Sequence, residues 1–263
     1  DAPGADGNGD APQFKPDFNL ELLRSTDYVG GIFARRDALL AAGGYAQNPD
    51  GATYDMLLRL VDHAGEGSVG HIPEVLQRVP DTARTRATET EARTALIAHL
   101  ERRGLVADIL PGMLSGISRR VVYQHTEMPR VSIIVPTRNR LDLLGPCIES
   151  LLAHTPYPHW ELIVVDNGSD DPALLNYFAS LRTALSGRIQ ILPHPGEFNF
   201  AAMNNRAAEI ASGDYLLLLN DDTVCIHDDW LESLLVHAQR PDVGVVGARL
   251  LYPDSLTVQH AGV

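Results

Sequence analysis

In the second half of the chain, short apolar runs alternate with longer segments in which apolar residues recur at helical spacing. Runs of strand length lie at residues 131–135, 161–165, 189–192, 215–219 and 243–251. The helices predicted between them lie at residues 141–152, 172–185, 201–211 and 229–238. Apolar strands that alternate with helices are typical of a parallel sheet covered on both faces. The pattern therefore predicts an α/β domain over residues 129–263.

The first half of the chain has a weaker pattern, which predicts short mixed elements. Residues 1–13 are polar and predict a flexible tail. Residues 14–80 predict a partial domain, whose expected elements are strands at 32–34 and 70–76 and helices at 37–42 and 54–63. Residues 81–128 predict a connector with one helix that ends near Gly104, because glycine is common just after a helix.

The composition is that of an ordinary globular protein, with 44% hydrophobic and 21% charged residues among 263. The formal net charge of −13 argues against nucleic acid as a partner. No stretch approaches the ~18 consecutive apolar residues that a membrane span requires. Two cysteines are too few for a disulfide framework, which favours a reducing compartment. We therefore expect a cytoplasmic protein, and peripheral association with the inner face of the membrane stays open.

Both ends of the chain resemble the ends of a fragment. The chain begins with Asp1 and no leader segment, and it ends at Val263 without a polar tail. These ends predict a piece of a longer polypeptide that carries further modules.

Polar clusters follow three of the predicted strands, at residues 136–140, 166–171 and 220–223. The carboxyl ends of parallel strands meet at one edge of the sheet, where ligands of such sheets bind. Asp, Asn and Gly are also ordinary turn residues, so any single cluster has a structural explanation. Asp221 and Asp222 are the sharpest feature, because adjacent carboxylates favour a compensating cation. Oxygen ligands of this kind suit Mg²⁺ or Mn²⁺ together with substrate phosphates.

Residues 129–263 resemble the nucleotide-binding half of a family 2 glycosyltransferase with the GT-A fold, a Rossmann-like, mostly parallel sheet. The segments that resemble this family are VSIIVPTRN at 131–139, IVVDNGS at 163–169, NNRAA at 204–208, GDY at 213–215 and LNDD at 219–222. Each segment alone is a weak signal, but their order and spacing are specific.

The resemblance implies roles for particular residues. Those expected to bind the nucleotide are Pro136, Thr137, Asn139, Asp166, Asn205, Asn220 and Asp221. Asp222 would be the principal ligand of Mn²⁺ or Mg²⁺. Asp166 would bond the imide N–H of uracil or thymine, which favours a UDP- or dTDP-linked sugar as donor. Asn220 departs from the family's D-x-D pattern, because it brings no charge to the first place.

Residues 14–80 resemble the acceptor-side half of the same kind of domain. The segments that carry this likeness are KPDFN at 15–19, GGIFARR at 30–36, AGGY at 42–45 and HIPEVL at 71–76. The chain would thus join the second half of one module to the first half of the next. Thr53 stands where the family has its catalytic aspartate, and Asp55 is a weak candidate to replace that base. The resemblance therefore leaves the catalytic residue of the first half unknown.

The function expected from the resemblance is metal-dependent, inverting transfer of a sugar from a nucleotide diphosphate donor to a saccharide acceptor, in the biosynthesis of a polysaccharide. A base would take the acceptor proton while the metal neutralises the departing diphosphate, and loss of a general base costs ~10²–10⁴ in rate. Two alternatives stay open. One is a degenerate module that binds a sugar nucleotide or glycan without catalysis, and the other is an α/β nucleotidyltransferase.

Overall fold

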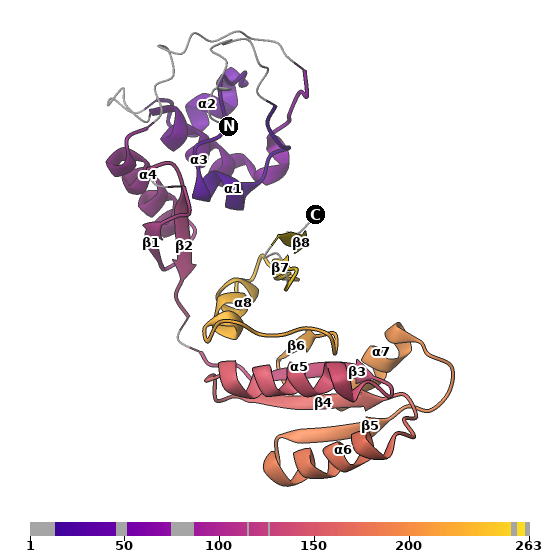
Figure 1. Cartoon of the computed structure of the whole chain (residues 1–263). Helices are drawn as coiled ribbons and strands as arrows, with labels where there is room; N and C mark the ends of the chain where they lie inside the picture. The colour runs from indigo at the N-terminus through magenta and orange to yellow at the C-terminus, as the bar shows by residue number, and fades with distance from the viewer. Residues whose placement is uncertain are drawn as a thin grey trace, which may run out of the picture. The chain divides into compact units, whose positions relative to one another are not determined.

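The computed structural model describes residues 14–45, 52–74, 87–114, 116–125, 127–253 and 257–260. The chain divides into two compact units, Asp1–Gln124 and His125–Val263 (Figure 1), called here the first and the second unit. The tail expected at residues 1–13 and the start of the expected connector, up to residue 86, lie outside the described residues. Among the described residues, no helix is both long enough and apolar enough to cross a membrane.

The second unit is built on a sheet of four parallel strands. These strands are β3 (Val131–Thr137), β4 (Trp160–Asp166), β5 (Ile189–Pro193) and β6 (Tyr215–Leu218). They lie in the order β5-β4-β3-β6, so the chain crosses from β5 at one edge to β6 at the other. The α/β fold with a parallel sheet, predicted from the alternating pattern, is confirmed.

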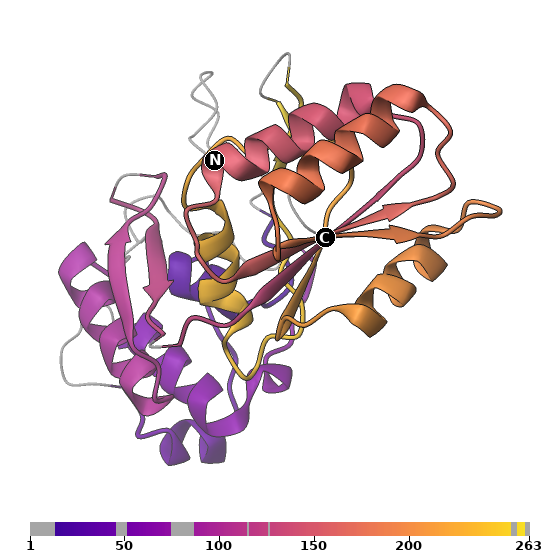
Figure 2. The ribbon, with the colours of Figure 1, turned by 90° about the horizontal axis from the view of Figure 1, so that it is seen from below.

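Helices cover both faces of this sheet. They are α5 (Leu141–His154), α6 (Pro172–Ala184), α7 (Phe200–Ile210) and α8 (Trp230–Ala238). Figure 2 shows α5 and α6 on one side of the sheet and α7 on the other. Successive residues of a strand point to opposite faces. Ile133 accordingly belongs to the buried cluster that includes residues of α5 and α6, whereas its neighbour Ile134 packs with Met203 of α7.

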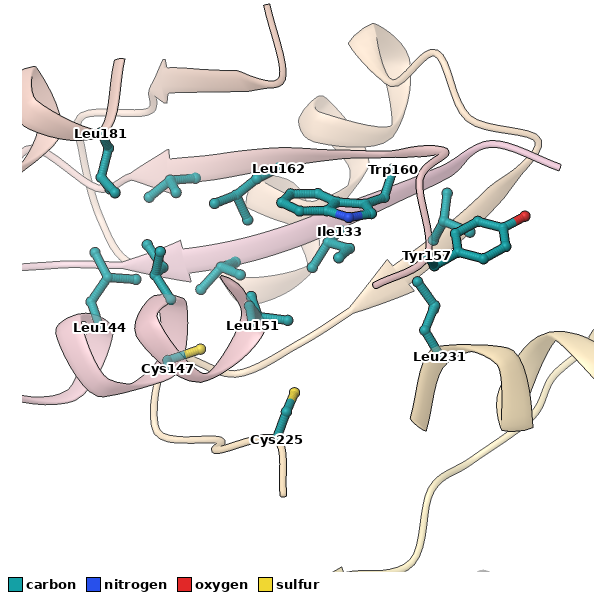
Figure 3. Close-up of a cluster of buried hydrophobic side chains, with 14 of the residues drawn as sticks. Ile133, Leu144, Cys147, Leu151, Tyr157, Trp160, Leu162, Leu181, Cys225 and Leu231 are labelled. Atoms are coloured by element: carbon teal, nitrogen blue, oxygen red, sulfur yellow. The ribbon is translucent and has the colours of Figure 1, made fainter. Parts of the chain in front are cut away.

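The larger core of the second unit lies between α5, α6 and the sheet (Figure 3). Trp160 at the start of β4 is 4% exposed, and the guanidinium carbon of Arg188 lies 4.0 Å from the centre of its ring. Cys147 of α5 and Cys225 after β6 are both buried free thiols in this core.

The strand expected at residues 243–251 is largely absent, and this expectation was wrong. Only β7 (Leu250–Leu251) forms, and it pairs in antiparallel fashion with β8 (Val258–His260). Apolar residues alone do not make a strand, because the backbone also needs a neighbour to accept its hydrogen bonds. No strand of the described residues pairs with residues 243–249.

The amino end of the sheet is held by a buried carboxylate. Glu161, near the start of β4, is 4% exposed and accepts hydrogen bonds from the hydroxyl of Ser132 (2.6 Å) and the backbone N–H of Ser212 (2.7 Å). Burial raises the pKa of Glu161, but these hydrogen bonds outweigh that effect, so its pKa lies below the ordinary value. Gly213 completes this contact, because a Cβ there would lie 2.6 Å from the backbone nitrogen of Ser132.

The first unit consists of short helices and one hairpin. Its elements are α1 (Leu20–Ser25), α2 (Arg36–Ala41), α3 (Ala52–Ala64), the 3₁₀ helix η1 (Glu66–Ser68), α4 (Glu89–Arg102), β1 (Ala107–Pro111) and β2 (Arg119–Tyr123). The core forms where α1, α3 and α4 meet. The helix expected in the connector is α4, and it packs on α3 within this unit.

Two expectations for the first half were wrong, and one element was not expected at all. Residues 32–34 do not form a strand, and neither do residues 70–74, while 75 and 76 lie outside the described residues. The antiparallel hairpin of β1 and β2 was not expected. In β2 the buried positions are Arg119, Val121 and Tyr123, so the alternation is real but begins with an arginine. A pattern of apolar residues alone does not reveal it.

Buried polar side chains connect the helices of the first unit. Arg24 of α1 is fully buried and donates hydrogen bonds to Nε2 of His99 (3.1 Å) and the hydroxyl of Tyr123 (3.0 Å). Nδ1 of His99 lies 2.8 Å from a carboxylate oxygen of Asp62. Burial lowers the pKa of His99, which keeps its ring neutral and able to accept from Arg24.

Candidate functional site

A pocket of about 310 Å³ lies at the carboxyl end of the sheet in the second unit. Its walls come from the end of β3 and the turn that follows, from the loop after β6, and from the loop that leads into α7. The lining residues are Pro136, Thr137, Arg138, Arg140, Phe198, Phe200, Asn220, Asp221 and Asp222. Four of the residues expected to bind a nucleotide and the expected metal ligand are thus brought together in one pocket.

A hydrogen bond joins β3 to the loop after β6 inside this pocket. Thr137, the last residue of β3, is 3% exposed, and its hydroxyl donates to Oδ2 of Asp221 at 2.8 Å. The strand ends are in register, because the backbone N–H of Leu219 donates to the carbonyl of Ile134 at 3.0 Å. Thr137 therefore fixes one oxygen of Asp221, and no described residue forms a hydrogen bond with the other oxygen.

The acidic pair has the chemistry of a divalent cation site. Asp222 is exposed in the pocket, and no hydrogen bond or ion pair joins its carboxylate to another described residue. No group of three or more His, Cys, Asp or Glu side chains in the described part of the chain is placed to hold a metal ion. Mg²⁺ typically binds through one or two carboxylates plus substrate phosphates. These residues therefore fit an ion that binds together with a phosphate-bearing ligand.

Helix α5 binds the loop at residues 220–225, called here the acidic loop, through two side chains that do not line the pocket. The thiol of Cys147 donates to the carbonyl of Asn220 at a sulfur–oxygen distance of 3.7 Å. Burial raises the pKa of Cys147 to about 12, so the thiol stays protonated and remains a donor rather than a nucleophile. One turn further along α5, the hydroxyl of Ser150 accepts from the backbone N–H of Cys225 at 3.0 Å. Asp221 and Asp222 lie between these two attachment points in the sequence.

Asn139 connects the turn after β3 to the loop after β4. It adopts a left-handed backbone conformation (φ 51°), its backbone N–H donates to the hydroxyl of Ser169 at 3.0 Å, and its amide donates to Asp170 at 2.7 Å. Asp166 stands opposite Thr137 in the strand register, and its Oδ1 accepts from the backbone N–H of Ser169 at 3.0 Å. Neither Asn139 nor Asp166 is among the lining residues of the pocket, so their binding roles stay predictions.

Sequence reasoning missed two arginines and two phenylalanines that line the pocket. Arg138 and Arg140 belong to the polar cluster at 136–140, so their position was available as a signal. Arg140 forms a paired contact with Asp142, at 2.9 Å and 3.0 Å. Phe198 and Phe200 gave no signal, because exposed and buried aromatic residues look alike in a sequence.

The asparagine pair in α7 divides between two environments. Asn205, the expected nucleotide ligand, is exposed and does not line the pocket. Asn204 is 5% exposed, and its amide donates to the carbonyl of Phe200 at 2.8 Å. The binding role of Asn205 stays a prediction, and Asn204 serves the structure of the helix.

In the first unit, the residues considered for a catalytic base lie at the start of α3. Thr53 is exposed there. Asp55 accepts from Nε of Arg59 at 3.0 Å, and Arg59 also donates to the carbonyl oxygens of Ala42 (2.6 Å) and Gly44 (2.7 Å). Asp55 therefore orients an arginine that fixes the loop after α2.

Comparison with known families decides the class of the second unit. Residues 132–261 match the sequence model of glycosyl transferase family 2, and this range includes every residue that lines the pocket. This segment is a family 2 glycosyltransferase domain. The resemblance found in the sequence is confirmed at the level of the family.

Two relatives align with nearly the whole chain, and so with more than its glycosyltransferase domain. O-antigen biosynthesis protein RfbC from Myxococcus xanthus is 42% identical over 269 residues, covering 98% of this chain and 20% of that protein. The uncharacterized protein y4gI from Sinorhizobium fredii is 39% identical over 265 residues, covering 95% of this chain and 28% of that protein. The chain thus spans less than a third of the length of these relatives.

Among solved structures, the chain is similar to a mannosyltransferase from Pyrobaculum calidifontis in complex with GDP-mannose and Mn²⁺. The sequence identity is 25% and the TM-score is 0.43, with 50% of this chain and 38% of the other covered.

Proposed function

We propose that the second unit provides the donor-binding half of a metal-dependent, inverting glycosyltransferase. The donor would be a sugar linked to a nucleotide diphosphate, and the acceptor a saccharide. The observation that carries this proposal is the pocket in which Thr137, Asn220, Asp221 and Asp222 meet at the carboxyl end of the sheet. Family membership supports the reaction class, and the acidic pair supports a role for Mn²⁺ or Mg²⁺.

Asp222 and Asp221 would hold the ion, with Asp222 as the principal ligand because its carboxylate is free of other described partners. A divalent ion bound there supplies positive charge that stabilises a departing diphosphate, a contribution worth several kcal/mol. Thr137 keeps Asp221 oriented, so this carboxylate does not have to rearrange when the donor arrives, whereas Asp222 can adjust to the ion. Asn220 can donate or accept a hydrogen bond from a ribose or phosphate group without adding charge.

In an inverting transfer, the acceptor hydroxyl attacks the anomeric carbon as the bond to the diphosphate breaks, and a base takes the hydroxyl proton. The hydroxyl of Thr53 cannot take this proton at neutral pH as a carboxylate can. Asp55 is engaged by Arg59, at 2.8 Å in its ion pair. These observations support a first unit that lacks a working base, as in the degenerate module considered above.

The wider role proposed for the protein is polysaccharide biosynthesis. The support is the similarity to an O-antigen biosynthesis protein, of which this chain covers 20%. UDP or dTDP is the proposed nucleotide, on the expected role of Asp166 at the end of β4. Cytoplasmic location, association with the inner face of the membrane and further modules on the same polypeptide complete the proposal.

Calorimetric titration with UDP and with dTDP, each with and without Mn²⁺, tests the donor half. We expect the wild-type chain to bind nucleotide when the ion is present. Asp222→Ala should weaken binding about tenfold or more, because a hydrogen bond or contact to a charged group contributes ~1.5–3 kcal/mol. Asp228→Ala is the matched control, since Asp228 is exposed and pairs with His154 outside the pocket.

Equal binding by the wild type and Asp222→Ala contradicts the proposed metal site. Release of pyrophosphate from a nucleoside triphosphate would instead favour the nucleotidyltransferase alternative.

A further inference from the structure

Phe198 and Phe200 form the aromatic wall of a pocket whose other walls are mainly charged and polar. These residues are 57% and 43% exposed, and neither belongs to the buried clusters that the described residues of the second unit form. Complete burial of a phenylalanine stabilises a protein by ~1.5–3 kcal/mol, and these two rings gain only part of that. Packing of the core therefore does not account for two aromatic residues at these positions.

A helix-capping role also fails to account for them. Asn199, between the two rings, caps α7, since its side chain accepts from the backbone N–H of Ala202 at 3.0 Å. The residue before such a cap often packs on the fourth residue of the helix, here Met203. Met203 is fully buried against the sheet, whereas Phe198 is 57% exposed. A capping contact would bury Phe198 more fully than this.

The segment that presents the two rings is fixed by the end of β4. The amide of Asn167 donates to the carbonyl oxygens of His194 (2.8 Å) and Gly196 (3.4 Å). The backbone N–H of His194 donates to the carbonyl of Asp166 at 2.8 Å. At the carboxyl end of this segment, Asn199 caps the first turn of α7, so the segment is held at both of its ends. Side chains on a preorganised segment lose less entropy when a ligand binds.

We propose that Phe198 and Phe200 form an aromatic subsite on which the base of the nucleotide donor stacks. The inference rests on the proposed function, in which Asp166 bonds the edge of the base, and it adds two residues that stack on the face of the base. The carboxylates of the pocket select the diphosphate end of the ligand through a cation. Of the remaining parts of a nucleotide sugar, the base alone has a flat aromatic face. Stacking of a base on an aromatic side chain contributes ~1–3 kcal/mol and tolerates different bases.

The test compares two ligands that share the diphosphate and differ in the base. UDP and inorganic pyrophosphate, each with Mn²⁺, are titrated into the full chain and into Phe198→Ala, Phe200→Ala and the double variant. Phe198→Tyr and Phe200→Tyr keep a ring, whereas Phe198→Leu and Phe200→Leu keep apolar surface without one. Phe33→Ala is the matched control, because Phe33 is fully exposed and lies in the first unit.

We expect the double alanine variant to lose about tenfold or more in UDP affinity, from the stacking contribution of ~1–3 kcal/mol. Binding of pyrophosphate should not change, the tyrosine variants should bind UDP like the wild type, and the leucine variants should fall in between. Phe33→Ala should bind both ligands normally.

Three results would overturn the subsite. Unchanged UDP affinity in the double variant excludes a contact with the base. An equal loss for UDP and pyrophosphate shows that the rings support the loop instead. If the wild type binds pyrophosphate and UDP equally, the base has no subsite here, and if it binds neither, the proposed function itself fails.

Discussion

The hydroxyl of Thr137 determines where one carboxylate oxygen of the pocket lies. It is nearly inaccessible to solvent, and it donates to Asp221 across the gap between neighbouring strand ends. A buried donor on a rigid strand can hold a flexible carboxylate in one orientation without help from the ligand. Asp222 has no such support from the described residues, so it is free to adjust to an ion. The two adjacent aspartates therefore differ in their freedom to move before any ligand arrives.

Thr137→Val should weaken binding of UDP with Mn²⁺ roughly three- to tenfold, because a typical hydrogen bond contributes ~0.5–1.5 kcal/mol. Valine keeps the volume of threonine and removes the donor. Thr137→Ser keeps the donor and should bind nearly as the wild type does. Calorimetric titration measures both affinities. A Thr137→Ser variant as weak as Thr137→Val would show that the methyl group, and not the hydroxyl, is what matters.

At the scale of elements, α5 supports the acidic loop through side chains that do not enter the pocket. Ser150 is 9% exposed, donates to the carbonyl of Cys147 in its own helix, and accepts from the backbone N–H of Cys225. A polar group that is buried without a partner is costly, so the N–H of Cys225 depends on this serine. The helix thereby determines the course of the chain from Asn220 to Cys225.

Ser150→Ala should lower the free energy of unfolding by ~1–3 kcal/mol, since it leaves a buried N–H without a partner. It should also weaken nucleotide binding, because one attachment of the acidic loop is lost. Ser180→Ala is the matched control: Ser180 donates to the carbonyl three residues earlier in the same way but is exposed on α6. Urea denaturation and calorimetric titration give the two quantities. Equal effects of the two substitutions would contradict the role of Ser150.

The amino end of the sheet should make the stability of the second unit depend on pH. The pKa of Glu161 is lower in the folded chain than its ordinary value of 4.5, so the ionised form stabilises the fold. This stabilisation is complete above the unfolded pKa and is lost as pH falls through the folded one. Glu161→Gln should therefore be less stable than the wild type at pH 7. Urea denaturation at several pH values should also show that Glu161→Gln loses less stability than the wild type as the pH falls below about 4.5.

At the scale of the whole molecule, the chain carries its pocket in one of two compact units. All lining residues lie between Pro136 and Asp222, within the second unit. The first unit has its own core and its own network of buried polar side chains. Every residue that lines the pocket therefore comes from the second unit.

Residues 125–263 expressed alone should fold and bind UDP with Mn²⁺ as the complete chain does. The expectation follows from the separate core of the second unit and from the origin of every pocket residue. Titration of both proteins side by side measures the difference. A large loss of affinity in the shorter protein would mean that the first unit contributes to the site.

The sequence predicted the parallel sheet and most of the pocket because both follow from regular patterns. Alternating apolar strands and helices leave few other folds, and polar residues at strand ends must then meet at one edge. The hairpin of β1 and β2 was not predicted, because a buried arginine, Arg119, interrupts the expected alternation of apolar and polar residues. The place of Phe198 and Phe200 in the pocket was not predicted, because the exposure of an aromatic residue depends on tertiary packing. The difference between Asn204 and Asn205 depends on which face α7 turns to the sheet, and the sequence motif does not specify it.

The position of Trp160 has a practical consequence for spectroscopy. The chain has two tryptophans, Trp160 and Trp230, and both lie in the second unit. Trp160 is buried in its core beside the cation of Arg188, so its emission should change when that core becomes hydrated. Indole fluorescence thus reports on the glycosyltransferase domain alone, whereas far-ultraviolet circular dichroism averages over both units. Any disagreement between the two signals during denaturation separates the melting of one unit from that of the other.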